Sequence, residues 1–154
     1  MHLDADLDLR LERHLSAPPH AVWRAWTEAD LLMRWFAPKP VRTEEATIEP
    51  RPGGRFYTRM VMPDGQEIAG DGCILAAEPD RRLVFTDALG PGWRPAAAPF
   101  MTAIVTMEPD GDGTAYRAVV LHADRAAREK HEDMGFAQGW GAAADQLEQV
   151  AATL

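Results

Sequence analysis

Apolar and polar residues alternate between residues 7 and 15, where leucine occupies positions 7, 9, 11 and 15. A period of two predicts a β-strand with one buried face. Downstream stretches of strand length are separated by Pro- and Gly-rich breaks at residues 52–54, 63–65 and 109–113, which favour hairpin connections between antiparallel strands. The further predicted strands are residues 41–50, 55–62, 66–77, 82–88, 100–108 and 114–122.

Two short helices are predicted between the first strand and the second. The first has an apolar stripe within residues 21–26 and follows Ser16, which we expect to be its N-cap. The second begins at Thr27 and Asp30, which have the spacing of a capping box, and ends before Pro38.

The strongest periodicity lies near the end of the chain and predicts a long amphipathic helix. Residues 124–134 are also compatible with a helix that continues into it. Gly135, Gly139 and Gly141 are unexpected there, because glycine inside a helix costs about 1 kcal/mol relative to alanine. They indicate either close approach of the helix to the sheet or space left for a ligand. Apolar residues recur at spacings of three and four at Phe136, Trp140, Ala143, Leu147, Val150 and Leu154.

These elements predict an α+β fold, in which antiparallel strands form one layer and helices another. No linker or internal repeat divides the sequence, so we expect residues 1–154 to form a single domain. A curved sheet around one amphipathic helix either fills its concave face with side chains or leaves a pocket there.

Charge and composition exclude several partners. The 16 basic and 24 acidic residues give a net charge of −8, with no basic cluster, so we expect neither nucleic acid nor an anionic membrane as a partner. Cys73 is the only cysteine, which rules out an internal disulfide and fits a reducing compartment. Residues 1–10 do not resemble an export signal, and no apolar run is long enough to span a membrane, so a cytoplasmic location is expected.

Motifs for cofactors, metals and nucleophilic catalysis are incomplete. Residues 65–72 have the spacing of a phosphate-binding loop, but Asp71 occupies the lysine position. Residues 110–121 lack the glycine and glutamate of a calcium loop. His131 and Glu132 begin a zincin-like string that lacks its second histidine. We therefore expect neither a cofactor nor a metal ion.

Polar residues near strand ends provide the best candidates for chemistry. Strand alternation places His122 on the same face as Tyr116, and Asp87 lies at the end of another strand. Together with His131 these residues could orient the polar end of a ligand or act as acid and base. The alternative is structural, with His122 capping a strand and Asp87 a turn.

Aromatic and methionine side chains are the candidates for binding an apolar molecule, although ordinary core packing is an equally good explanation. Trp93 lies in a proline-rich loop, residues 91–99, where it could act as a lid but more simply anchors the loop. The candidate ligand-binding residues are Trp35, Phe36, Phe56, Met60, Phe85, Asp87, Trp93, Phe100, Met101, His122, Met134 and Trp140.

Four segments together resemble the START-like, helix-grip superfamily, also called SRPBCC, in its bacterial branch named after the activator of heat-shock protein 90 ATPase. The resemblance runs from about residue 7 to the end of the chain and implies a curved antiparallel sheet wrapped around a long C-terminal helix and a hydrophobic cavity. The segments that carry it are WFAP at 35–38, PGGRF at 52–56, EP with RLVFT at 78–86, and HEDMGF with GW at 131–140.

The resemblance leaves the activity open, because its members include carriers of lipids and hormones as well as cyclases and aromatases. Our main hypothesis is non-enzymatic binding of a small apolar or aromatic molecule in the cavity. An enzyme of the cyclase or hydrolase type, with His122 or His131 as base and Asp87 or Tyr116 assisting, is a second hypothesis. A module that contacts a chaperone is a third, and it requires an exposed apolar patch on a sheet edge.

Overall fold

The computed structural model describes residues 2–154 and contains an antiparallel sheet of seven strands. The strand order is β1-β9-β8-β5-β4-β3-β2, so the first strand of the chain pairs with the last. The ends of the predicted strands agree with the observed ones to within two residues. The strands are β1 (Asp8–Leu15), β2 (Arg42–Ile48), β3 (Arg55–Val61), β4 (Glu67–Glu78), β5 (Arg82–Thr86), β8 (Thr102–Asp110) and β9 (Gly113–Leu121).

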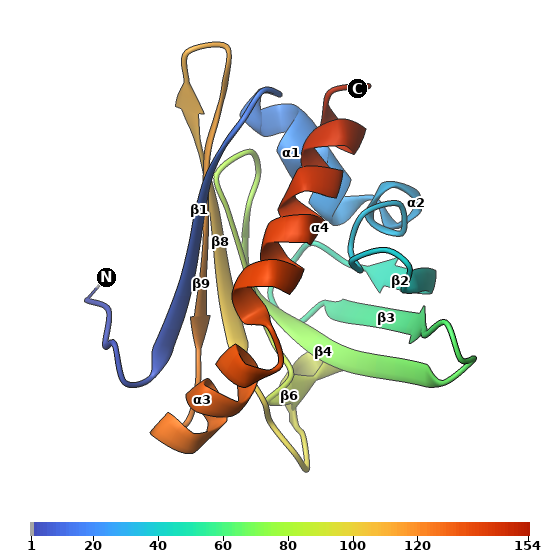
Figure 1. Cartoon of the computed structure of the whole chain (residues 1–154), viewed down its shortest axis with the longest axis vertical. Helices are drawn as coiled ribbons and strands as arrows, with labels where there is room; N and C mark the ends of the chain where they lie inside the picture. Colours follow the sequence, from blue (N-terminus) through green and yellow to red (C-terminus); the bar gives the residue numbers. More distant parts are fainter. Residues whose placement is uncertain (1) are drawn as a thin grey trace.

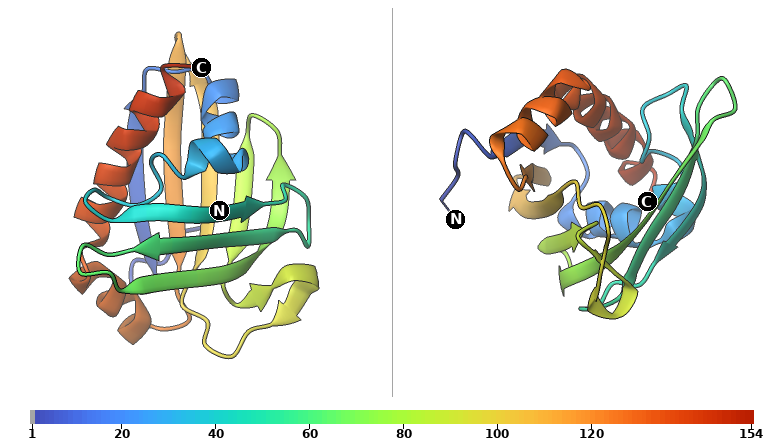
Figure 2. Two further views of the ribbon diagram at one scale, coloured as in Figure 1. Left: turned by 90° about the vertical axis from the view of Figure 1, so that its right-hand side faces the viewer. Right: turned by 90° about the horizontal axis from the view of Figure 1, so that it is seen from below.

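The sheet curves around the long helix α4 (Phe136–Ala151), as Figure 1 shows. Strands β2 to β4 run almost crosswise to β1, β8 and β9, and α4 lies between these two groups (Figure 2). The α+β helix-grip arrangement expected from the sequence is therefore confirmed. Leu154 is an exception to the predicted apolar seam, because α4 ends at Ala151 and the Leu154 side chain is exposed.

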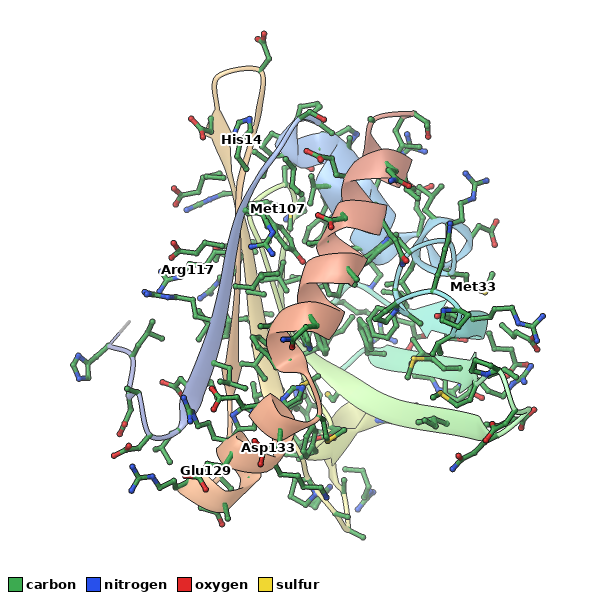
Figure 3. The ribbon with its side chains drawn as sticks, in the orientation of Figure 1. His14, Met33, Met107, Arg117, Glu129 and Asp133 are labelled. Carbon is green, nitrogen blue, oxygen red and sulfur yellow. The ribbon has the colours of Figure 1, made fainter. Side chains whose placement is uncertain are left out.

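Strand alternation separates the two faces of the sheet. Met107 and Tyr116 are partners on neighbouring strands, and both are buried on the side of α4. Arg117, the next residue along β9, projects from the outer face (Figure 3). The polar outer face and apolar inner face are what a one-sided antiparallel sheet requires.

The helices α1 (Pro19–Thr27) and α2 (Ala29–Leu32) close one end of the sheet, but their predicted caps are wrong. Pro18 is the N-cap of α1, and the backbone N–H of Ser16 instead donates to the Glu148 carboxylate. Glu28, and not Thr27, is the N-cap of α2. The Thr27 hydroxyl donates to the carbonyl of Trp23 within the preceding helix. Neither the Ser16 nor the Thr27 side chain therefore caps the helix that it was expected to begin.

Aromatic rings form the centre of the core. Trp26 is 1% exposed and meets the ring of Trp35 edge-on, with 4.8 Å between the centroids. The Trp35 indole N–H donates to the carbonyl of Ala25, which fixes the segment after α2 against α1. Phe56 and Phe85 stack in parallel at 4.2 Å beneath Trp26.

A glycine separates the two C-terminal helices. Residues 124–134 form a separate helix, α3 (Arg125–Asp133), capped by the Asp124 side chain, which accepts from the Ala127 N–H. Gly135 then adopts the left-handed conformation, with φ of 91°, and redirects the chain into α4. A side chain rarely tolerates this conformation, so glycine is required at the break.

The loop after β5 is longer and more ordered than a simple connection. It contains the short strands β6 (Leu89–Gly90) and β7 (Arg94–Pro95) around a turn of 3-10 helix, Pro91–Trp93. The Trp93 ring covers Gly53, where a Cβ atom would lie 2.7 Å from it. The Gly92 N–H donates to the carbonyl of Gly53, so the ring and the backbone both attach this loop to the β2–β3 connection.

Candidate ligand-binding pocket

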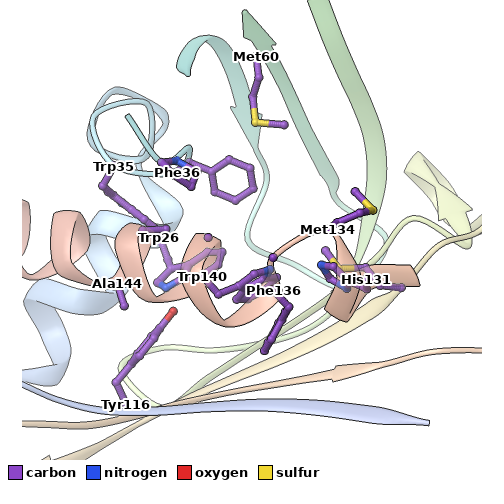
Figure 4. Close-up of a pocket in the computed structure, with 15 residues that line it drawn as sticks. Trp26, Trp35, Phe36, Met60, Tyr116, His131, Met134, Phe136, Trp140 and Ala144 are labelled. Atoms are coloured by element: carbon purple, nitrogen blue, oxygen red, sulfur yellow. The ribbon is translucent and has the colours of Figure 1, made fainter. Parts of the chain in front are cut away.

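A pocket of about 330 Å³ lies between the sheet, α4 and the segment that follows α2 (Figure 4). Its wall is mainly aromatic and aliphatic, and Met134 at the α3–α4 junction is 67% exposed. The size is at the lower end of the range for small-molecule sites. The lining residues are Trp26, Trp35, Phe36, Pro38, Met60, Met101, Tyr116, His131, Met134, Gly135, Phe136, Gly139, Trp140, Ala143 and Ala144.

The helix glycines divide between the two explanations offered by the sequence. A Cβ atom on Gly139 would meet only the Pro38 ring, at 3.8 Å, so this glycine leaves space in the pocket wall. A Cβ atom on Gly141 would lie 2.9 Å from the Arg13 guanidinium, so this glycine permits close packing of α4 on β1. Gly135 is not inside a helix, because it forms the break between α3 and α4.

Six of the predicted ligand-binding residues line the pocket: Trp35, Phe36, Met60, Met101, Met134 and Trp140. The other six do not. Phe56 and Phe85 are covered by Trp26 and belong to the core behind the wall. Trp93 packs on Gly53 in the β5–β8 loop, outside the pocket lining, which is the anchoring position considered from the sequence.

Asp87 has a structural role in the β5–β8 loop. It follows β5 instead of ending it, and its carboxylate accepts the backbone N–H groups of Phe100 and Met101, at 2.8 and 3.0 Å. These bonds close the base of the β5–β8 loop. Within residues 2–154 no hydrogen bond or ion pair joins Asp87 to His122 or His131, so the expected contact among the three side chains is not observed.

His122 and His131 do meet, in a buried pair at the end of β9. His122 Nε2 lies 2.9 Å from His131 Nδ1, and His122 Nδ1 lies 2.8 Å from the carbonyl oxygen of Leu7. Both side chains are 7% exposed, but only His131 lines the pocket. Phe100 lies against both imidazoles and outside the lining.

Burial controls the protonation of the polar groups in the wall. Burial, followed by the neighbouring His122, lowers the pKa of His131 from 6.5 to about 4. Burial also raises the pKa of Tyr116, an effect that the nearby Trp26 indole partly offsets. The Tyr116 hydroxyl is directed toward Trp26, whose buried N–H has no hydrogen-bond partner in the described chain (Figure 4).

Several lining residues were not among the sequence candidates, although their signals were present. Trp26 lies on the predicted stripe of α1 and Phe136 and Ala143 on that of α4, so the pattern marked them as buried without indicating which faced a pocket. Within residues 2–154, no group of three His, Cys, Asp or Glu side chains is placed to hold a metal ion. No helix in that range combines the length and apolarity needed to cross a bilayer.

An antiparallel sheet around a C-terminal helix, with an apolar pocket between them, defines a helix-grip domain. The family described as "Activator of Hsp90 ATPase homolog 1-like protein" matches residues 16–152, and the chain belongs to this family. The resemblance seen in the sequence is thus confirmed.

Solved structures agree with this assignment. A crystal structure from Nitrosomonas europaea is 42% identical, covers 98% of this chain and 97% of its own, and superposes with a TM-score of 0.95. A protein from Rhodobacter sphaeroides, at 24% identity, covers 99% of this chain and 97% of its own, with a TM-score of 0.85.

An AHSA1-like protein from Aeromonas hydrophila, solved by NMR, is 21% identical and covers 95% of this chain and 92% of its own, with a TM-score of 0.72. At these last two identities the likeness concerns the fold. Comparison with curated protein sequences gives no match.

Proposed function

We propose that the protein binds a small aromatic or apolar molecule in the pocket between the sheet and α4, without chemically changing it. The observation that carries this proposal is an apolar hollow of about 330 Å³ whose wall contains two polar side chains, Tyr116 on β9 and His131 on α3. Such a combination is typical of small-molecule sites, in which apolar surface supplies affinity and isolated polar groups supply orientation.

The expected affinity follows from the apolar area that a ligand would bury. A bicyclic aromatic molecule has roughly the size of a tryptophan side chain, and burying about 200 Å² of it contributes about 5 kcal/mol. That free energy corresponds to a Kd of about 0.2 mM, and favourable ring contacts with Trp35 and Trp140 would lower it.

The experiment is titration of the protein with a panel of neutral mono- and bicyclic aromatic compounds, followed by calorimetry. In the variant Gly139→Leu the new side chain would project into the pocket, since little else lies near that position. We expect it to weaken binding at least tenfold while leaving the folded state intact by circular dichroism. The control Gln149→Leu adds a similar side chain on the exposed face of α4 and should bind normally.

Two results would contradict the proposal. One is that no compound in the panel binds with a Kd below about 1 mM, which is about five times weaker than the Kd expected from the buried apolar area. The other is that Gly139→Leu binds as well as the parent protein, because the pocket would then not be the site.

Catalysis is less well supported by the geometry. The histidine pair is the arrangement that a base would need, but a pKa of about 4 makes His131 a weak proton acceptor at neutral pH. Asp87, a proposed assistant, bonds to backbone N–H groups instead. Binding requires neither a strong base nor the carboxylate.

A chaperone contact is likewise without a specific surface in residues 2–154. The large exposed apolar side chains there are Ile68, Trp93, Met134 and Leu154, which lie on four different parts of the fold. None belongs to the edge strands β1 and β2. The patch that this hypothesis required on a sheet edge is therefore not found in the part of the chain described.

A further inference from the structure

The hydrogen bonds of the histidine pair determine which nitrogen carries each proton. The carbonyl oxygen of Leu7 can only accept, so His122 Nδ1 must carry a hydrogen and donate it. The Nε2 atom of a neutral His122 is then an acceptor, and His131 Nδ1 donates to it. In a neutral His131, Nε2 is consequently left with a free lone pair.

This lone pair lies on the side of the imidazole that points away from His122. Nδ1 and Nε2 point in nearly opposite directions from the ring, and the bond to His122 occupies the Nδ1 side. That bond is the only one the His131 ring forms within residues 2–154, and the ring itself is part of the pocket wall. Figure 4 places His131 at the opposite end of the lining from Tyr116.

The surroundings of the pair favour the neutral form. Phe100 and Phe136 flank the His131 ring, with centroids 4.8 and 5.1 Å away, and no carboxylate within residues 2–154 forms an ion pair with either imidazole. Lys130, the residue before His131 on α3, holds its ammonium 6.0 Å from the centroid of the Phe100 ring. Burial lowers the pKa of His131 because a charged imidazole loses its contact with water there.

We propose that the pocket selects neutral aromatic molecules bearing a hydrogen-bond donor, such as a phenolic hydroxyl, and that this donor binds His131 Nε2. The proposal rests on the proposed function and specifies its ligand class. His122 is a positioning residue in this scheme, because it holds the tautomer of His131 without lining the pocket. A methyl ether lacks the donor, and an aromatic carboxylate would place two acceptors against each other.

The first test compares 2-naphthol with 2-methoxynaphthalene and 2-naphthoate by calorimetry at pH 7. The naphthol and its ether share the aromatic surface, so their difference reports the donor. One hydrogen bond to a buried acceptor predicts a Kd about fivefold lower for naphthol than for the ether. In His131→Phe this ratio should fall to about one, with little change for the ether. In Gln149→Leu, which alters an exposed position on α4, the ratio should persist.

The second test reads the tautomers without a ligand. Long-range nitrogen–proton NMR spectra of the histidine rings should show hydrogen on Nδ1 and none on Nε2 for both His122 and His131. Free histidine prefers the opposite tautomer, so ordinary folding alone would not produce this signature. In His122→Phe the acceptor is gone, and His131 should shift toward a protonated Nε2 and lose selectivity for naphthol.

The outcomes separate this proposal from the simpler one. Equal binding of naphthol and its ether, or strongest binding of naphthoate, overturns the donor specificity while leaving the pocket as a binding site. A hydrogen on His131 Nε2 in the unliganded protein also overturns it. If none of the three compounds binds, the donor specificity is refuted, and the wider aromatic panel decides separately whether the pocket binds anything.

Discussion

Acid should weaken this protein through His131. Burial, followed by the proximity of His122, lowers its pKa from 6.5 to about 4 in the folded state. Between these two values the unfolded chain binds more protons than the folded one, so its free energy falls relative to that of the native state. The free energy of unfolding therefore keeps its full value above about pH 6.5 and decreases as the pH falls toward 4.

The magnitude follows from the size of this shift in pKa. Moving the pKa from 6.5 to about 4 corresponds to about 3 kcal/mol in total at 1.36 kcal/mol for each pH unit. Between pH 7 and pH 5 the same linkage relation gives a loss of about 2 kcal/mol in the free energy of unfolding. A domain of this size is commonly stable by only about 5 to 15 kcal/mol, so the loss is easily measured.

The assay is urea denaturation followed by tryptophan fluorescence at pH 7, 6 and 5. His131→Gln can still donate to His122 but does not titrate, so it should lose about 2 kcal/mol less than the parent protein over this interval. His20→Gln removes an exposed imidazole and should retain the full pH dependence. If the parent protein and His131→Gln lose stability equally, the burial of His131 does not control the acid response.

Two further changes test contacts that shape the pocket and its surroundings. Gly53 and Gly65 both have positive φ, 80° and 90°, but a Cβ atom would clash with Trp93 only at Gly53. Gly53→Ala should therefore lower the free energy of unfolding by about 1 to 3 kcal/mol, and by more than Gly65→Ala does. Equal losses in urea denaturation would mean that the Trp93 contact is unimportant. Gln146→Leu removes three side-chain hydrogen bonds to the segment after α2, two donated to carbonyls and one accepted from the Lys39 N–H, and should cost about 1 to 3 kcal/mol and speed proteolysis there, unlike Gln149→Leu. Unchanged proteolysis would show that other contacts hold the segment.

The strands and the seam of α4 were predictable because their periodicity records burial on a single face. The helix caps were not predictable. The Thr27 hydroxyl could accept from an N–H of the following helix or donate to a carbonyl of the preceding one, and the sequence does not distinguish these local bonds. Ser16 was misread for a different reason, because its partner Glu148 is remote in sequence.

The pocket was only partly predictable. Periodicity indicates that a side chain such as Phe56 or Phe36 points inward, but Phe56 packs beneath Trp26 whereas Phe36 reaches the hollow. The pairing of His122 with His131 combines strand parity with a helix position, and α3 begins at Arg125, shortly after β9 ends at Leu121, so the two histidines lie at the same end of the strand.

Because Gly135 separates α3 from α4, the sequences of the two helices can change independently among related proteins. The inner face of α4 is packed into the core, so most substitutions there would disturb folding. Helix α3 is mostly polar, and His131 is its one buried residue. Changes on α3 and at Met134 could therefore retune what enters the pocket in related proteins, while the sheet and α4 stay the same.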